Sequence, residues 1–234
     1  MSWLPGGCSA QQAPPAASEL PNLGLMGSIP IYWGEAGNVN ELLGGDGASH
    51  WARAELEKSY RLHPLDALTP ESLTEIKFLL LAQPRALSGS ENVALDNWVR
   101  GGGHLLLFAD PMLTGESKFP IGDRRRPQDV ILLSPILRHW GLELQFDVER
   151  PEGFALVEAA GPPIPINRPG SIVTAESAAN CTLAAEAVLA SCSIGAGRVV
   201  LLADAAVLDL YDPHPQAAAA LGWLAGEAFP ESGK

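Results

Sequence analysis

Two apolar runs with a helix-like segment between them dominate the hydrophobic pattern of the chain. Residues 78–82 and 105–109 lack in/out alternation, which is typical of strands buried on both faces of a sheet. Between them, Ser88 and Glu91 have the spacing of a capping box, and the glycines at 101–103 predict the end of a helix. This order predicts a strand–helix–strand unit, and hence an α/β protein with a mostly parallel sheet.

Weaker patterns predict further elements on both sides of this unit. Gly195 and Gly197 separate two apolar runs near the C-terminus, which is the pattern of a β-hairpin. The other expected strands are residues 28–33, 61–65 and 142–146, and the other expected helices are residues 50–60 with Ser49 as N-cap, 129–140 and 215–228. Residues 66–76, with Thr69 as N-cap and Pro70 at the first helical position, are expected to form a short helix or a turn.

The domain organisation follows from where these patterns begin and end. Residues 1–24, rich in Ala, Pro, Gln and Ser, are expected to be a disordered tail, and residues 229–234 a second tail. Residues 25–228 then form a single α/β domain, with short strands inserted at 150–180. The long polar loop 112–128 follows the end of a strand, so we expect a lid or a partner-binding loop there.

The charge of the chain limits its partners. Its 15 basic and 27 acidic residues give a net charge of −12, which would repel nucleic acids and anionic membranes. We interpret the basic cluster Arg124–Arg125–Arg126 as a solvated loop, with a local anion site as the alternative. No apolar run reaches the roughly 18–20 residues of a membrane span, so no transmembrane segment is predicted.

The three cysteines give no metal-binding pattern, because no CxxC or Cys/His spacing occurs. Cys192 is expected to be a small buried hydrophobe, and it can pair with Cys181 if the compartment is oxidising. The residues around Cys8 faintly resemble a lipoprotein cleavage box, but the segment before it is too short for a signal peptide. A cytoplasmic location is therefore favoured, with a periplasmic or lipid-anchored protein as the alternative if the true start lies upstream.

Candidate binding residues are those that follow the predicted strands, because open α/β sheets bind ligands beyond the carboxyl ends of their strands. These candidates are Trp33, Glu35, Gln83, Arg85, Asp110, Met112, Asp204, Asp209 and His214. Strand-end aspartates can hold a cation, but more often they cap the next turn, so we predict neither a metal nor another cofactor. His214 could act as a base, yet no serine or cysteine stands in an elbow motif, and GxGxxG, Walker A and HExxH patterns are absent.

Two segments carry a resemblance to a known family. LLLAQPRALSGSENVALDNWVRGGGHLLLFADP (79–111) and GAGRVVLLADAAVLD (195–209) resemble the soluble domain of gliding-motility-type auxiliary components of ABC transporters. The resemblance implies a three-layer, flavodoxin-like or class I glutamine-amidotransferase-like fold. Amidotransferase-like enzymes place a nucleophilic cysteine at a strand-to-helix elbow, whereas the loops here hold Gln83-Pro84-Arg85 and Asp110-Pro111.

These departures favour a non-catalytic role. We expect an accessory domain that binds a partner protein or a small ligand, linked to an ABC-type transport or cell-envelope system. The alternative is an amidotransferase-like or sugar-processing hydrolase with an atypical active site that uses Asp110, Asp204 or His214. A third possibility is a metal-dependent ligand binder at the same acidic rim.

Overall fold

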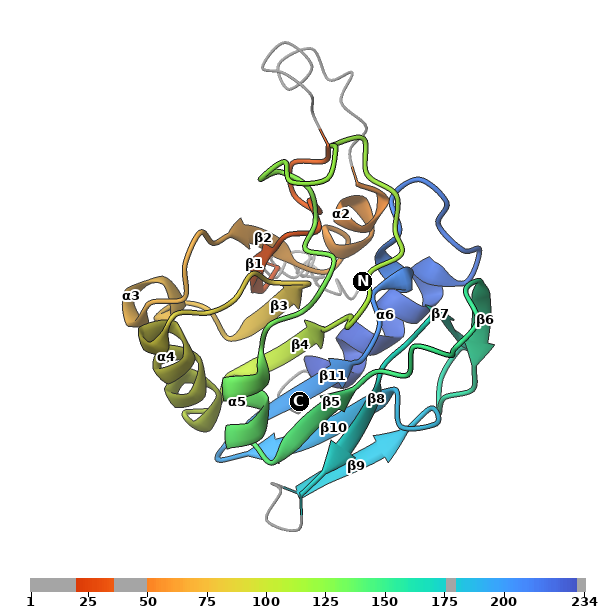
Figure 1. Cartoon of the computed structure of the whole chain (residues 1–234). Helices are drawn as coiled ribbons and strands as arrows, with labels where there is room; N and C mark the ends of the chain where they lie inside the picture. The colour runs from red at the N-terminus through yellow and green to blue at the C-terminus, as the bar shows by residue number, and fades with distance from the viewer. Residues whose placement is uncertain (1–19, 36–49, 176–179, 231–234) are drawn as a thin grey trace, which may run out of the picture.

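A seven-stranded sheet forms the centre of the protein in the computed structural model, which describes residues 20–35, 50–175 and 180–230 (Figure 1). The strand order is β2-β1-β3-β4-β11-β10-β9. The first five strands in this order are parallel, and β10 runs antiparallel to both of its neighbours. The bounds are β1 Asn22–Gly27, β2 Arg61–Pro64, β3 Phe78–Ala82, β4 His104–Phe108, β9 Asn180–Ala184, β10 Leu189–Ile194 and β11 Gly197–Leu202.

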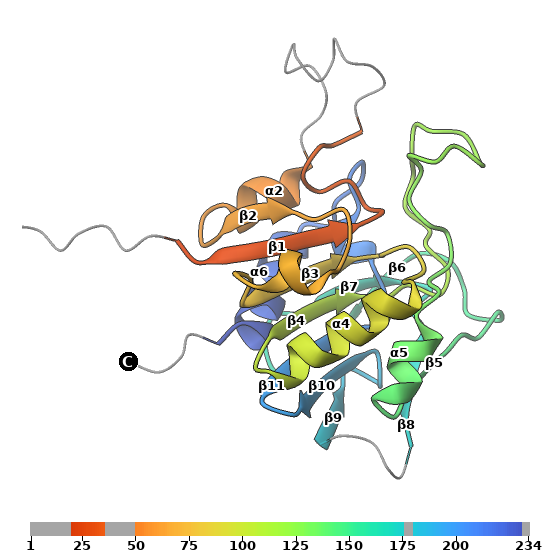
Figure 2. The same cartoon turned by 90° about the vertical axis from the view of Figure 1, so that its left-hand side faces the viewer.

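Helices cover both faces of the sheet and complete a three-layer arrangement (Figure 2). On one face lie α3 (Pro70–Leu73), α4 (Gly89–Arg100) and α5 (Ser134–His139), which contact one another in that order. On the other face, α6 (Ala217–Ala228) packs on β4 and β11 and contacts α2 (Trp51–Leu56) and the 3₁₀ turn η1 (Ala206–Leu208). The mixed α/β fold with a mostly parallel sheet and the C-terminal hairpin β10–β11 confirm the fold prediction.

Two small antiparallel sheets flank the main one. One pairs β5 (Leu142–Gln145) with β8 (Ser171–Thr174), and the other pairs β6 (Phe154–Val157) with β7 (Ile164–Asn167). The predicted strand at 142–146 therefore exists, but it lies outside the main sheet.

The strand–helix–strand unit of β3, α4 and β4 forms because its two apolar strands are buried and its helix has a complete N-terminal cap. All residues of β3 are buried, as are those of β4 after His104. The capping box of α4 is complete, since the Glu91 N–H donates to Ser88 Oγ at 3.2 Å and the Ser88 N–H donates to Glu91 Oε2 at 2.9 Å. Each fully buried leucine of these strands stabilises the fold by roughly 1.5–3 kcal/mol.

The first strand is not where the sequence predicts it. Residues 28–33 form turns, and β1 occupies Asn22–Gly27, partly inside the expected tail. Pro30 has no N–H to donate to a neighbouring strand, whereas residues 22–27 pair with both β2 and β3. Gly27 permits this pairing, because a Cβ atom there would lie 2.0 Å from the Ala82 carbonyl oxygen.

Three predicted helices are shorter than expected. The helix predicted at 129–140 begins only at Ser134, with proline in its first turn, and that predicted at 215–228 begins at Ala217. The helix predicted at 50–60 ends at Leu56, and its N-cap is His50, whose ring accepts the Ala52 N–H at 3.2 Å. The predicted cap Ser49 lies outside the described residues.

The C-terminal boundary also differs from the prediction. Phe229, assigned to a tail, is buried against the core. Its ring centroid lies 5.7 Å from that of Tyr60 and 5.2 Å from that of Phe78.

Cys181 and Cys192 form a disulfide between β9 and β10. This is the pair that the sequence allows for an oxidising compartment. Cys192 is buried, as predicted, while Cys8 lies outside the described residues. None of the helices in the described part of the chain is long and apolar enough to cross a lipid bilayer.

Candidate functional site at the carboxyl edge of the sheet

The carboxyl ends of β1, β3, β4 and β11 meet at one edge of the sheet, where all but one of the predicted site residues lie. The strand order reverses between β1 and β3, because β2 lies on one side of β1 while β3 and β4 lie on the other. Such a switch point is the usual ligand site of open α/β sheets. The side chains there form three groups with different chemistry.

Gln83 forms the first group, and it holds the loops of the edge together. It follows β3 with a positive φ of 49°, and its side chain is fully buried (0% exposed). Its amide nitrogen donates to the carbonyl oxygens of Asp110 and Gln128, both at 2.9 Å, and its amide oxygen accepts the Asp110 N–H at 2.8 Å. Ser28 adds a backbone hydrogen bond to the Gln83 carbonyl at 3.0 Å. Both N–H groups and the oxygen of the Gln83 amide are therefore occupied by the protein itself.

Asp110 and Asp204, which follow β4 and β11, are buried beside this glutamine. All four of their carboxylate oxygens accept backbone N–H groups. The donors are Met112 (2.8 Å) and Ala205 (3.1 Å) for Asp110, and Ala206 (2.6 Å) and Asn167 (2.9 Å) for Asp204. The contacts to Met112 and Ala206, each two residues beyond its aspartate, are the turn caps that the sequence favours, whereas the other two contacts join distant segments. Asp110 also links β4 to the residue after Asp204.

Burial disfavours the charged forms of both carboxyl groups. It raises the pKa of Asp110 to about 7, although the N–H groups of Met112 and Ala205 oppose part of the increase. Burial, and then the charge of Asp110, raises the pKa of Asp204 well above its usual range. Within the described residues, no group of three or more His, Cys, Asp or Glu side chains is placed to hold a metal ion.

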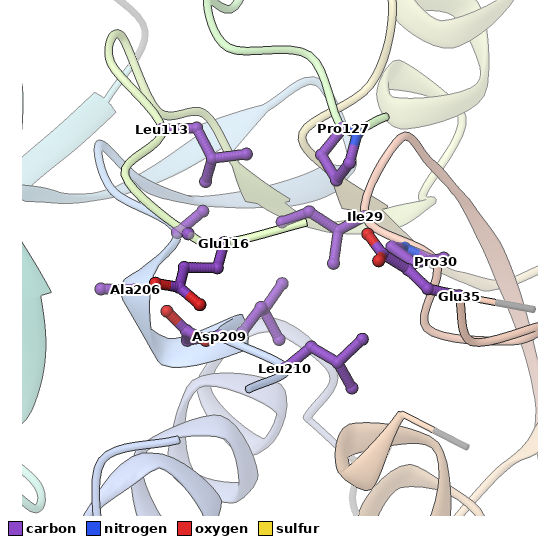
Figure 3. Close-up of a pocket in the computed structure, with 12 residues that line it drawn as sticks. Ile29, Pro30, Glu35, Leu113, Glu116, Pro127, Ala206, Asp209 and Leu210 are labelled. Carbon is purple, nitrogen blue, oxygen red and sulfur yellow. The ribbon is translucent and has the colours of Figure 1, made fainter. Parts of the chain in front are cut away.

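An acidic pocket is the second group, lined by Glu35, Glu116 and Asp209 together with apolar residues of the β1 and η1 loops. Figure 3 shows the carboxylates of Glu116 and Asp209 turned toward each other, with Glu35 on the opposite side. The free volume is about 30 Å³, which accommodates only one or two water molecules. The pocket as it stands therefore has no room for a metabolite.

Glu35 anchors this pocket although it is far in sequence from its partners. Its carboxylate accepts hydrogen bonds from the Ser117 hydroxyl at 2.6 Å, the Lys118 N–H at 2.9 Å and the Tyr211 hydroxyl at 2.7 Å. Desolvation, followed by the interaction with Glu35, raises the pKa of Tyr211 to about 12. Glu35 thus fastens the long loop and the segment before α6 to the end of β1.

His50 is a buried group that the sequence pattern does not single out as functional. Its Nε2 donates to the Leu208 carbonyl oxygen at 3.0 Å while Nδ1 accepts the Ala52 N–H, which fixes the neutral tautomer. Burial lowers the pKa of His50 to about 4. The neighbouring Trp51 donates from its indole nitrogen to the Asp209 carbonyl oxygen at 2.7 Å. These contacts join α2 to the loop after η1.

The third group, called here the arginine pocket, lies at the end of β1 beside the switch point. Arg85 and the run Arg124–Arg126 line a hollow of about 600 Å³, together with Trp33. Trp33 is 64% exposed, and Asp66 is the acidic residue in the lining. This hollow is large enough for a small organic ligand, for which pockets of roughly 300–1,000 Å³ are usual.

The structure therefore separates the predicted site residues into sets. Trp33 and Arg85 line the arginine pocket, and Glu35 shares the acidic pocket with Asp209. Gln83 is hydrogen-bonded to Asp110, which in turn accepts the Met112 N–H and lies close enough to Asp204 to raise its pKa. His214 lies apart, where its ring is 5.9 Å from that of Phe154 and its Nδ1 accepts the Gln216 N–H at 3.1 Å. Two residues of the acidic pocket region, Tyr211, which donates to Glu35, and Glu116, which lines the pocket, were not predicted. No local sequence pattern indicates them, because their positions depend on contacts between distant segments.

Comparisons with solved structures support the fold. An exo-β-1,4-mannosidase from Opitutaceae bacterium strain TAV5 matches with a TM-score of 0.54 at 16% identity, over 91% of this chain and 37% of that protein. A putative ThuA-like protein from Bacteroides uniformis gives 0.50 at 11% identity, over 93% and 94% of the two chains. A cytoplasmic protein from Salmonella typhimurium gives 0.51 at 11% identity, over 90% and 98%. The chain thus spans little more than a third of the mannosidase, and all three likenesses concern the fold alone.

The comparison of sequences identifies the family. Residues 39–159 match the family described as an ABC-type uncharacterized transport system, and this match covers just over half of the 234 residues. No curated protein matches the sequence. The match includes β2, β3, α4 and β4 together with the long loop and the arginine run. The chain therefore belongs to the family of ABC-type uncharacterized transport systems.

Proposed function

We propose that this protein is a non-catalytic accessory domain of an ABC-type transport system, and that it binds a partner or ligand at the carboxyl edge of its sheet. The observation that carries the proposal is that the Gln83 side chain is buried and fully hydrogen-bonded within the protein. Gln83 follows β3 with a positive φ, in one of the two turns where an enzyme of the amidotransferase-like type could hold its nucleophile. Here a buried amide occupies the position, and its hydrogen bonds are all made within the protein.

The two buried aspartates support the same conclusion. A glycoside hydrolase needs carboxyl groups that face its substrate, whereas Asp110 and Asp204 are 1% and 0% exposed and bind four backbone N–H groups. Exposing either carboxyl group to a sugar would break these hydrogen bonds and open the turns that they hold.

The long loop between β4 and α5 provides a surface for a partner. It projects beyond the sheet (Figure 2), and Ile121, near the middle of the loop in sequence, is 88% exposed. The base of the loop is fixed, since the Gln128 N–H donates to Ser28 Oγ at 2.8 Å and the Leu113 N–H donates to the Asp129 carbonyl at 2.9 Å. A fixed base with an exposed apolar side chain on the loop suits the binding of another protein, because little ordering of the loop base is needed.

Site-specific photo-cross-linking tests the partner. A photoreactive amino acid at position 121 should capture a subunit of an ABC transporter in membranes of the native host. The same amino acid at Val93, which is 61% exposed on α4, is the matched control and should capture much less. Equal capture at both positions would contradict the assignment of the loop as a partner surface.

An enzymatic role is the second candidate, because the mannosidase with a similar fold acts on sugars. The purified protein should not hydrolyse glutamine or a panel of aryl glycosides. If it does, and if Asp110→Asn or His214→Ala abolishes the activity, the non-catalytic assignment is wrong.

A further inference from the structure

The arginine pocket carries an inference that rests on the proposed function and makes it more specific. We propose that this pocket binds a small organic anion through a carboxylate or phosphate group, with Arg124 as the principal contact and Trp33 covering the rest of the ligand. The pocket lies at the end of β1, next to the reversal in strand order, where this type of sheet places its ligands.

Three of the four guanidinium groups have fixed positions. Each is held by an ion pair with a carboxylate outside the lining of the pocket. The pairs are Arg85 with Glu91 (2.7 Å), Arg125 with Asp123 (2.7 Å) and Arg126 with Asp129 (3.3 Å). Their positive charges are partly neutralised, so they shape the walls and orient donors more than they supply charge.

Arg124 differs from its neighbours. Its side chain is exposed, and it has no hydrogen bond or ion pair with another described residue. Its five N–H donors are therefore available for an anion, and no internal ion pair has to be broken when one binds. A guanidinium group binds carboxylate and phosphate oxygens in the same two-pronged geometry, so the structure indicates the class of anion and the experiment distinguishes its source.

Trp33 gives the pocket an apolar surface. Its ring meets Tyr32 edge to face at 4.7 Å, and Tyr32 is itself covered by the Arg53 guanidinium at 4.3 Å from its ring centroid. Trp33 therefore packs against Tyr32 on one side, while 64% of its surface is exposed to solvent. An exposed indole beside a cluster of cations favours a ligand with both a charged group and a carbon skeleton.

Titration of the purified full chain at low salt tests this inference. The probes are citrate, inorganic phosphate and glucose 6-phosphate, with glucose as the neutral control, and binding is followed by tryptophan fluorescence and amide chemical shifts. At least one anion should give saturable shifts at Ser28, Trp33 and Arg85, and glucose should give none. Tighter binding of citrate identifies a carboxylate site, and tighter binding of the phosphates identifies a phosphate site.

Two charge reversals supply the matched comparison. Arg124→Glu should weaken binding by about tenfold or more, because it removes a charge-assisted contact. Arg61→Glu makes the same change in net charge at an exposed residue at the start of β2, and should weaken binding by less than about threefold. Circular dichroism verifies that both variants fold.

Three outcomes would overturn the inference: no saturable shifts with any probe, shifts elsewhere on the molecule, or equal weakening by the two reversals. These outcomes are separable from failure of the proposed function, which the cross-link at position 121 and the hydrolysis assays test independently. If the cross-link succeeds while every anion fails, only the ligand site is wrong. Hydrolysis of glucose 6-phosphate would instead contradict the non-catalytic role.

Discussion

Replacing Asp110 with asparagine should change how the stability of the fold depends on pH. Burial raises the pKa of Asp110 to about 7, so the folded chain retains this proton more tightly than the unfolded chain does. The stabilisation from the protonated group is complete below its unfolded pKa near 3.9, and it is lost as pH rises through about 7. Asparagine does not titrate, so the variant should not lose this stability as pH rises through about 7.

The magnitude follows from the size of the shift. About 3 pKa units at 1.36 kcal/mol each give roughly 4 kcal/mol over the whole titration, of which roughly 3 kcal/mol falls between pH 5 and pH 8. Asparagine also turns one oxygen into a donor, which leaves the N–H of Met112 or Ala205 without its acceptor at a cost of about 1–3 kcal/mol. The variant should therefore equal or fall below wild type at pH 5 and exceed it at pH 8.

Urea unfolding followed by far-ultraviolet circular dichroism at several pH values gives the required free energies. The difference between variant and wild type is the informative quantity, because the lowered pKa of His50 makes wild-type stability rise over part of the same range. Asp212→Asn, which removes an exposed carboxylate, is the matched control for the loss of one acidic group. If the difference between Asp110→Asn and wild type does not change with pH, the reasoning about a buried protonated carboxyl group is refuted.

Three further predictions concern buried contacts. Because burial lowers the pKa of His50 to about 4, the stability of wild type relative to His50→Gln should fall by roughly 3 kcal/mol as pH falls from 6.5 toward 4 in the same unfolding assay, since the opposing contribution of Asp110 is present in both proteins. Gln83→Ala should lower the unfolding free energy by at least about 2 kcal/mol, since it leaves buried backbone groups without partners, whereas the exposed Gln145→Ala should change it by less than about 0.5 kcal/mol. Reduction of the disulfide between Cys181 and Cys192, 11 residues apart, should cost about 2–3 kcal/mol, which thermal unfolding with and without reductant measures. An unchanged unfolding temperature would contradict this stabilising effect.

The fold could be predicted from the sequence where the signals are local. Ser88 and Glu91 define the start of α4 within four residues, and the uninterrupted apolar runs predict β3 and β4 regardless of what surrounds them. The first strand was placed wrongly because β1 contains glycines at Gly24 and Gly27, which weaken a strand pattern. Those glycines are favoured by the close approach of β3 and, at Gly24, of the Leu65 and Ile76 side chains, which the local sequence does not reveal.

The candidate site shows the same limit. The sequence predicts which residues follow strands, and this is enough to find Gln83, Asp110 and Asp204. It does not predict that Tyr211 donates to Glu35 across 176 positions, because that contact depends on how two loops cross the edge of the sheet. The arginine run is visible in the sequence as a solvated cluster, and its proximity to Trp33 becomes visible only in three dimensions.

The disulfide between β9 and β10 also affects how copies of the protein meet. Within the described residues, β9 is the outermost strand of the main sheet on that side, and an outermost strand presents unpaired N–H and C=O groups to solvent. A covalent link keeps β9 in register on β10, so the backbone N–H and C=O groups along that edge of β10 stay paired. On reduction we expect β9 to separate more often and the chain to self-associate through the exposed edge, which light scattering at increasing protein concentration would detect. We therefore expect the redox state of this cysteine pair to affect the colloidal stability of the domain.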